Sequence, residues 1–296
     1  MSPMPTAVIT GTSTGIGEAT TKVLAARGWR VFATMRDLNR AAGLERALEQ
    51  AGIRDRLELE RLDVTDPASI GEAIAAMLSR AGGGLDAVVH NAGVAAGGAF
   101  EDIPEAEVRR VMETNFFGVL EVTRAVLPVF RKQRRGRIVI VSSEAAFAGQ
   151  PANSIYCASK WALEGWAESL TYELEPFGLH VILVEPGPCR TPIWTSSPRL
   201  MPATSPYRDW TQQVSDAVDR HVAHKGRDPR EVAEVIADVL TAGRPRLRYP
   251  VGRDAHVNHF LRGKVTARLS HRLIGWYLGI PRWRPEDAAA RQAELL

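Results

Sequence analysis

The sequence of 296 residues predicts a doubly wound parallel α/β sheet of about seven strands, with helices on both faces and a helical extension at the C-terminus. Short runs rich in Val, Ile and Leu alternate with longer amphipathic stretches, as in repeated βαβ units. These runs do not alternate cleanly between apolar and polar residues, which is typical of strands covered on both faces. The expected strands are Ala7–Thr10, Arg30–Thr34, Leu57–Leu62, Ala87–His90, Arg137–Val141, His180–Glu185 and a short one near Leu247–Val251.

Helices are expected between these strands, near residues 16–27, 40–51, 68–80, 105–131, 156–176, 207–224 and 230–242. Asp66-Pro67 and Asp228-Pro229 each predict an N-cap followed by proline at the first helical position. Glu231 adds the acid of a capping box. The proline-rich stretch 188–206 is expected to be a long loop over the substrate that contains one short helix. Because no linker divides the chain, we expect residues 1–251 to form one domain.

Composition narrows the function classes. With 45% hydrophobic and 24% charged residues, the chain has the make-up of a folded soluble protein. Cys157 and Cys189 form no Cys-x-x-Cys pair, which argues against a disulfide scaffold and a cysteine-based zinc site, and no metal is expected. The apolar runs are too short for a spanning helix, and the first residues are too few for a signal peptide. We therefore expect a cytoplasmic protein.

The formal net charge of +3 is unevenly distributed. The segment Arg244–Arg284 holds nine arginines and one lysine against Asp254, so it carries +9 and the remainder carries −6. Apolar and basic residues within 264–280 follow the spacing of an amphipathic helix. We interpret residues 252–296 as a basic extension that caps the substrate loop or a neighbouring subunit. Peripheral contact with an anionic membrane through 264–280 is the alternative, and nucleic acid is not an expected partner.

The first strand leads into a glycine-rich turn, Thr10-Gly-Thr-Ser-Thr-Gly-Ile-Gly17. A strand, a glycine turn and a helix start together present backbone N–H groups to a phosphate. Gly11 permits the tight turn, Gly15 a close backbone approach and Gly17 close packing of the helix. The turn therefore predicts a Rossmann-type nucleotide site, although glycines that simply end a strand are the alternative for this motif alone.

Tyr156 and Lys160 lie four residues apart and share one helix face. Alone, the pair could be a surface tyrosine beside a solvated lysine. Together with the glycine turn, Asn91-Ala-Gly93, Ser143 and Pro186-Gly187, it resembles the classical branch of the short-chain dehydrogenase/reductase family in order and spacing. The resemblance runs from about Thr6 to Thr191 and more weakly to Val251.

This resemblance implies an NAD(P)-dependent oxidoreductase with the catalytic residues Asn115, Ser143, Tyr156 and Lys160. Tyr156 would be the general acid and base, and the Lys160 ammonium would favour its phenolate. Ser143 would hydrogen-bond the substrate oxygen, and Asn115 would support a proton-relay water through a helix distortion. A regulator that senses NAD(P) without turnover is the alternative function.

The resemblance also implies the residues that bind the cofactor: Gly11, Ser13, Thr14, Gly15, Ile16, Gly17, Arg36, Asp63, Val64, Asn91, Ala92, Gly93, Tyr156, Lys160, Pro186, Gly187 and Thr191. In an NAD enzyme an acid at the end of the second strand receives the ribose 2′-hydroxyl. Met35 occupies that position, so Arg36 is expected to pair with a 2′-phosphate, which predicts NADP(H). In the rival interpretation Asp37 binds the ribose and NAD(H) is the cofactor.

The stretches Tyr156–Trp166 and Val31–Asp37 resemble the hydroxysteroid and retinol dehydrogenase-like subset of the family. That implies a lipophilic alcohol or carbonyl as substrate, steroid-, retinoid- or long-chain-like. The expected substrate contacts are Ser143, Glu144, Phe147, Tyr156, Pro188 and Trp194, with Gln150 and Met201 as further candidates. Glu144 either faces solvent or contacts a polar or basic group. A homodimer or homotetramer is expected through the helices near 105–131 and 156–176.

Overall fold

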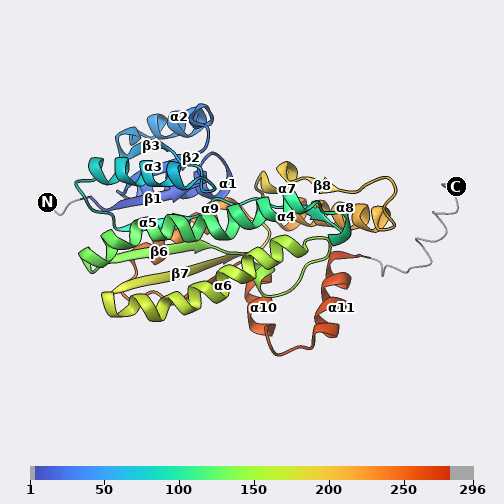
Figure 1. The fold of residues 1–296 in the computed structure, drawn as a ribbon. Helices are drawn as coiled ribbons and strands as arrows, with labels where there is room; N and C mark the ends of the chain where they lie inside the picture. Colours follow the sequence, from blue (N-terminus) through green and yellow to red (C-terminus); the bar gives the residue numbers. More distant parts are fainter. Residues whose placement is uncertain (1–3, 281–296) are drawn as a thin grey trace.

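The main sheet confirms the predicted fold class. A computed structural model describes residues 4–280, so the part of the predicted extension from 281 to 296 lies outside the described residues. Seven parallel strands are arranged in the order β3-β2-β1-β4-β6-β7-β9 (Figure 1). Their bounds are β1 Thr6–Thr10, β2 Arg30–Met35, β3 Leu57–Arg61, β4 Ala87–His90, β6 Gly136–Val141, β7 Leu179–Pro186 and β9 Arg248–Val251.

Helices cover both faces of this sheet. On these faces lie α1 Gly15–Ala26, α2 Ala42–Gln50, α3 Pro67–Arg80, α5 Gly118–Gln133, α6 Ser154–Leu174 and α9 Pro229–Thr241, and the chain also forms α4 Glu105–Met112 and α8 Arg208–Lys225. One buried apolar cluster joins α1, α2 and α9 to one face, and a second joins α3, α5 and α6 to the other. Short helical turns are η1 Leu38–Ala41, η2 Arg54–Arg56, η3 Phe100–Asp102, η5 Glu144–Ala146 and η6 Glu175–Phe177.

The two predicted N-caps are present. Asp66 accepts a hydrogen bond from the Ala68 N–H at 3.0 Å, and Asp228 accepts one from the Arg230 N–H at 2.8 Å. Glu231 corrects the capping-box expectation, since its carboxylate pairs with Arg227 at 2.6 Å. A guanidinium offers the carboxylate a charge-assisted bond, which is stronger than a bond to a neutral backbone N–H.

Three segments differ from the sequence expectation. The helix expected over 105–131 is divided by a π-helical turn, η4 (Glu113–Phe117). The stretch 188–206 contains the expected short helix, α7 (Ile193–Ser196), but it also forms β8 (Arg199–Leu200), which pairs with β5 (Gly97–Gly98). The extension contains two helices, α10 (Arg253–Leu261) and α11 (Ala267–Leu278) (Figure 1). Gly263 separates them because its φ of +73° lies in the left-handed region, which a continuing helix cannot adopt.

The connection direction reverses at β1, which pairs with β2 on one side and with β4 on the other. In open parallel sheets, ligands bind in the crevice outside the carboxyl ends of the strands at such a point. The fold therefore places the glycine turn after β1 and the residues after β4, β6 and β7 around one crevice. Within residues 4–280, no helix is both long enough and apolar enough to cross a membrane.

Candidate active site

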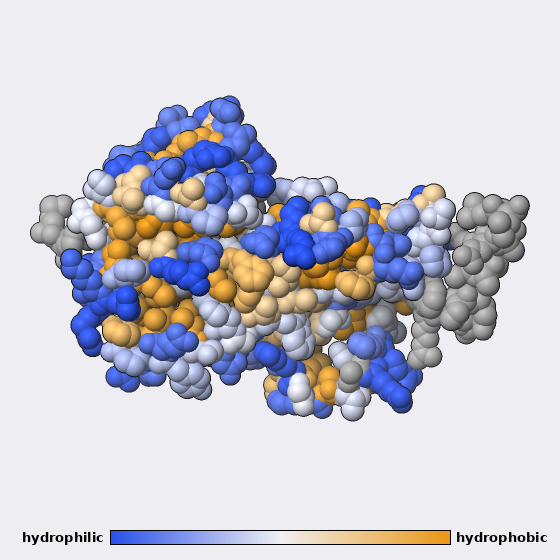
Figure 2. Space-filling model, in the orientation of Figure 1, coloured by the Kyte–Doolittle hydropathy of each residue, from blue (hydrophilic) through white to orange (hydrophobic). Residues whose placement is uncertain are grey.

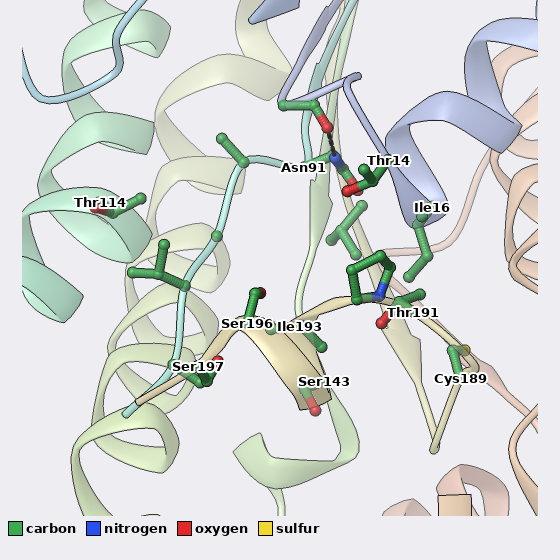
Figure 3. A pocket seen from close by; sticks show the side chains of 18 of the residues that line it. Thr14, Ile16, Asn91, Thr114, Ser143, Cys189, Thr191, Ile193, Ser196 and Ser197 are labelled. Atoms are coloured by element: carbon green, nitrogen blue, oxygen red, sulfur yellow. Dashed lines mark hydrogen bonds between the residues drawn. The ribbon is translucent and has the colours of Figure 1, made fainter. Parts of the chain in front are cut away.

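A cavity of about 750 Å³ occupies this crevice (Figure 3). The predicted cofactor-binding residues that line it are Gly11, Ser13, Thr14, Gly15, Ile16, Arg36, Asp63, Val64, Asn91, Ala92, Gly93, Tyr156, Lys160, Pro186, Gly187 and Thr191. Gly17 and Asn115 lie behind this lining. Figure 3 shows Thr14 and Ile16, at the start of α1, facing Thr191 and Ile193 from the segment after β7.

The glycine turn leaves no room for side chains at its three glycines. Gly11 has a φ of +71°, and a Cβ there would lie 2.7 Å from the Ala92 Cα. A Cβ on Gly17 would lie 2.4 Å from both the Asn91 Nδ2 and the Gly11 carbonyl oxygen. A side chain at Gly15 would meet Thr191 at 3.2 Å. Only glycines therefore fit this tightly packed turn, which leaves the N–H groups at the start of α1 uncovered by side chains, as a pyrophosphate site requires.

Asn91 fixes the shape of this turn. Its Nδ2 donates to the carbonyl oxygens of Thr10 at 3.0 Å and Gly11 at 2.9 Å (Figure 3). The Thr10 hydroxyl in turn accepts from the Asn91 N–H at 3.0 Å. Asn91 thus acts on the cofactor site by holding the end of β1 against the end of β4.

Two arginines line the end of the cavity next to β2. Arg36 and Arg40 are exposed, and neither side chain forms a hydrogen bond or ion pair with any residue between 4 and 280. Met35 is only 3% exposed, and the Asp37 carboxylate accepts from the Asn39 N–H at 3.0 Å as the N-cap of η1. Sequence reasoning missed Arg40, because only the fold of η1 brings it to the cavity.

Asp63 lies on the same side, just after β3. One of its oxygens, Oδ1, accepts from the Thr65 N–H at 3.0 Å and from the Thr65 hydroxyl at 2.8 Å. The Asp63 N–H donates to Ser69 at 3.0 Å. These bonds orient the carboxylate at the cavity wall, where it can accept a hydrogen bond from an amino group such as that of adenine.

Ser143, Tyr156 and Lys160 come together at the other end of the cavity. Ser143 follows β6 and N-caps η5, with the Ala145 N–H donating to its oxygen at 3.1 Å. Its hydroxyl also hydrogen-bonds the phenol of Tyr156. Lys160 donates to the Val141 carbonyl oxygen at 2.9 Å, and its Nζ lies 5.7 Å from the centre of the Tyr156 ring.

Burial dominates the protonation of this group. It raises the pKa of Tyr156 to about 12, and the bond from Ser143 acts in the opposite direction. Burial also lowers the pKa of Lys160 to about 8, against the attraction of Glu164. Burial therefore sets the direction of the Tyr156 pKa shift, and a phenolate favoured by the Lys160 ammonium stays a prediction. At neutral pH, Tyr156 carries its proton.

Asn115 lies in the π-helical turn and is 1% exposed. Its Nδ2 donates to the Val94 carbonyl oxygen at 2.9 Å and to the Ser159 hydroxyl at 3.0 Å, while its Oδ1 accepts from the Val94 N–H at 2.8 Å. Ser159 donates to the Tyr156 carbonyl oxygen at 2.7 Å. Asn115 thus ties the distorted helix to the turn of α6 that holds Tyr156, and π-turns of this kind occur frequently at functional sites.

Three of the four expected substrate contacts outside the catalytic residues line the cavity, namely Glu144, Pro188 and Trp194. The fourth, Phe147, lies outside it, packed edge-on against His259 with ring centres 5.1 Å apart. Of the further candidates, Gln150 lines the cavity and Met201 does not. Residues that sequence reasoning missed include Val94, Arg110, Thr114, Ile193, Ser196 and Ser197.

A buried acid cluster lies behind the predicted catalytic residues, and sequence reasoning missed it. Glu164 accepts from the Ser142 hydroxyl at 2.7 Å and from Arg248 Nε at 2.9 Å. Glu185 is fully buried, and neither carboxyl oxygen has a hydrogen-bond partner among residues 4–280. Burial, reinforced by Glu164, raises the pKa of Glu185 to about 8. The partners are separated by tens of residues, so no local pattern could reveal them.

Residues 5–200 match the family model described as short chain dehydrogenase. Human retinol dehydrogenase 8 is 36% identical over 291 residues, covering 91% of this chain and 90% of the relative. Human 17-beta-hydroxysteroid dehydrogenase type 1 is 34% identical over 261 residues, covering 82% and 76%.

Two solved structures are also similar. A short-chain dehydrogenase from Streptomyces avermitilis shares 32% identity with a TM-score of 0.77, covering 93% of this chain and 97% of that one. A single-substitution variant of actinorhodin polyketide ketoreductase, solved with NADPH, shares 30% identity with a TM-score of 0.72, covering 84% and 95%.

Proposed function

The chain belongs to the short-chain dehydrogenase family of oxidoreductases, and from that premise we propose that it interconverts a ketone or aldehyde and an alcohol on a lipophilic substrate with NADP(H). The meeting of Ser143, Tyr156 and Lys160 at one end of the nucleotide cavity carries the proposal. The names of the two human relatives, a retinol and a hydroxysteroid dehydrogenase, support a lipophilic substrate.

When bound, the nicotinamide supplies or accepts the hydride. The Ser143 hydroxyl binds the substrate oxygen and stabilises the charge that develops on it. Tyr156 holds a proton at neutral pH, since its pKa is about 12, and gives it to that oxygen during reduction. The Lys160 ammonium then stabilises the phenolate that remains, while Asn115 keeps the catalytic turn in place.

Tyr156→Phe tests this reaction, because it removes the proton donor and keeps the ring. We expect wild-type protein to reduce members of a panel of lipophilic ketones and aldehydes with NADPH, and the variant to be slower by about 10²–10⁴-fold. NADPH titration of both proteins provides the control for binding. Cofactor binding without turnover that depends on Tyr156 would favour the regulator.

The preference for NADP(H) is proposed from Arg36 and Arg40. Both cations line the β2 end of the cavity without a protein partner among the described residues, so a 2′-phosphate could accept charge-assisted bonds from them. Arg36→Asp should reduce the NADPH to NADH ratio in kcat/KM at least about 10-fold, the effect of roughly 1.4 kcal/mol. Arg46→Asp, on the exposed side of α2, is the charge-matched control. An unchanged ratio in Arg36→Asp would contradict the assignment.

We propose that residues 1–251 form one catalytic domain and that the extension caps its substrate side. Figure 1 shows α10 and α11 beyond the N-terminal end of α6. The Asn258 side chain on α10 reaches Glu144 at 3.0 Å, and Tyr277 on α11 packs on His221 of α8 with ring centres 5.0 Å apart. These contacts support an extension that caps the domain and argue against a free tail.

A second role proposed for the extension is peripheral contact with an anionic membrane. Trp276 is 81% exposed and Phe260 is 64% exposed, with Arg268 and Arg272 nearby on α11. Full-length protein should co-sediment with phosphatidylserine vesicles and lose that binding in a Trp276→Ser/Phe260→Ser variant. Equal partitioning of the two proteins would contradict membrane contact.

We further propose a homodimer or homotetramer that pairs through the α5–α6 face. Figure 2 shows hydrophobic residues interspersed among hydrophilic ones over this face. Phe117, Trp161 and Tyr172 are exposed apolar residues of η4 and α6. A Tyr172→Glu variant should lower the mass measured by light scattering, and a wild-type monomer would contradict the proposal.

A further inference from the structure

The acid that directly follows the catalytic serine lies in the substrate part of the cavity. Glu144 lines it together with Tyr156 and Pro188. Its Oε2 accepts from Asn258 Nδ2 at 3.0 Å and would lie 3.7 Å from a Cβ on Gly187, beside the predicted nicotinamide site. Its Oε1 has no hydrogen-bond partner within residues 4–280. One carboxyl oxygen is therefore oriented by the protein, and the other is available to a ligand.

No cation is among the charged and titratable groups that face Glu144 in the described residues. They are Asp254 from α10, Tyr156 from α6, Cys189 after β7 and Tyr277 from α11. Burial and the repulsion of Asp254 raise the pKa of Glu144 to about 7, while Asn258 acts in the opposite direction. No lysine, arginine or histidine among the described residues pairs with this carboxyl. Burying a carboxylate without a counter-ion costs free energy, and a cation on the ligand would offset that cost.

We propose that Glu144 binds an ammonium group of the substrate, so that the lipophilic substrate carries an amine on the carbon next to the reacting carbonyl or carbinol carbon. The inference rests on the proposed oxidoreductase function, since it specifies the substrate of that same site. Ser143 binds the substrate oxygen, and Glu144 lines the same cavity close enough to Tyr156 to act on its phenol electrostatically. Its carboxylate is therefore in position to bind a substituent close to the reacting carbon.

A hydroxyl on that carbon is the main competitor for this position, because it too can donate to Oε1. It brings no positive charge, so it leaves the repulsion between Glu144 and Asp254 in place. An ammonium neutralises that repulsion and gains a charge-assisted hydrogen bond. The site is therefore expected to favour an amine over both a hydroxyl and a hydrogen, by at least about 30-fold in kcat/KM, a modest effect for a withdrawn charge pair.

Three matched long-chain secondary alcohols test the proposal, with an amine, a hydroxyl or a hydrogen on the carbon next to the carbinol. Each is oxidised with NADP⁺ by wild type, Glu144→Gln and the control Glu173→Gln, which removes an exposed acid of α6. Wild type and Glu173→Gln should prefer the amine. The ratio of amine to unsubstituted alcohol should fall to near 1 in Glu144→Gln, and thermal melting shows that this variant is folded.

The pH dependence supplies a second readout. As pH rises through about 7, Glu144 loses its proton, so the amine preference of wild type should increase with pH. Glu144→Gln should show no such rise. Asn258→Leu removes a bond that lowers the pKa of Glu144, so the midpoint of the rise should move to higher pH.

Equal rates on the three alcohols, a hydroxyl preferred as strongly as the amine, or an amine preference that survives Glu144→Gln would each overturn the inference. Turnover that depends on Tyr156 in those cases would leave the proposed function intact. If no alcohol is oxidised and no ketone is reduced, the proposed function fails first. Calorimetric binding of dodecylamine and dodecanol to the NADP⁺-saturated protein then decides the inference, and equal affinities would overturn it.

Discussion

The cofactor half and the substrate half of the cavity are built in different ways. In the cofactor half, backbone approaches backbone, as where a Cβ on Gly17 would lie 2.4 Å from the Gly11 carbonyl oxygen. In the substrate half, side chains from distant segments set the chemistry, as where Asn258 orients Glu144 across 114 positions. The first half is fixed by local sterics. The second depends on how the C-terminal helices pack over it.

The largest effect is expected in the cofactor half, from Gly17→Ala. The added Cβ collides with the Asn91 amide and with the backbone of Gly11, so the turn must shift. We expect NADPH affinity to fall by about 100-fold and the free energy of unfolding to fall by about 1–3 kcal/mol. Fluorescence titration and urea unfolding measure the two quantities.

Gly71→Ala is the matched control for this substitution. Gly71 lies within α3, and a Cβ there would have no atom within 4 Å. It should raise stability by up to about 1 kcal/mol, since alanine favours a helix interior. Comparable losses of NADPH affinity in both variants would contradict the claim that close packing requires glycine at position 17 but not at position 71.

The next effect concerns the junction between the halves, where Tyr156 meets Lys160. With a pKa of about 8, Lys160 loses its ammonium form above that pH, whereas Tyr156, at about 12, still holds its proton. The kcat/KM for ketone reduction should therefore be level below pH 8 and fall up to about 10-fold per unit above it. A pH profile of the wild type tests this, and a level rate up to pH 10 would contradict the role given to Lys160.

A smaller effect is expected from Glu185→Gln, behind the substrate half. The folded pKa of Glu185, about 8, lies above its ordinary value of 4.5, so the wild type loses stability as pH rises from about 4.5 to 8. Glu164, Arg248, Arg262 and His259 face this carboxyl. The neutral glutamine removes that loss. The free energy of unfolding of the variant, relative to that of the wild type, should therefore rise by about 1 kcal/mol or more between pH 5 and pH 8.

Urea unfolding at the two pH values measures this change, with Glu173→Gln as the control on the exposed side of α6. A variant that loses stability at pH 8 relative to wild type would show that Glu185 acts as a paired carboxylate. In that case the substrate half would be held together by an ion pair with Arg248 in place of a buried neutral acid.

The contrast between the halves also explains how far the sequence could be interpreted. The strands, the glycine turn and the Tyr156–Lys160 pair follow from composition and spacing within a few residues. Arg40, Asn258 and the Glu164–Arg248 pair could not be predicted, because their roles arise from contacts between segments that only the fold brings together. The division of the extension at Gly263 was missed because a lone glycine is compatible with a helix or a break.

The smallest effects compare one local signal, the aspartate N-cap, on the two faces of the sheet. Asp66 caps α3, and Asp228 caps α9, each through one hydrogen bond to a backbone N–H. Replacing either with alanine should cost about 1 kcal/mol, because the bond is the same in both places. Thermal or urea unfolding of the two variants measures the costs. A much larger cost for Asp228→Ala would mean that the sheet face covered by α1 and α9 depends on this cap more than the local geometry indicates.

The central claim is that this cavity transfers a hydride from NADPH to a carbonyl whose oxygen takes its proton from Tyr156. The direct measurement is a single-turnover reaction of a long-chain ketone with NADPH deuterated at C4 of the nicotinamide, followed by mass spectrometry of the product. The account predicts an alcohol with one deuterium on the carbinol carbon for wild type, formed at least about 100-fold more slowly by Tyr156→Phe. An alcohol without deuterium, or equal rates in the two proteins, would contradict it.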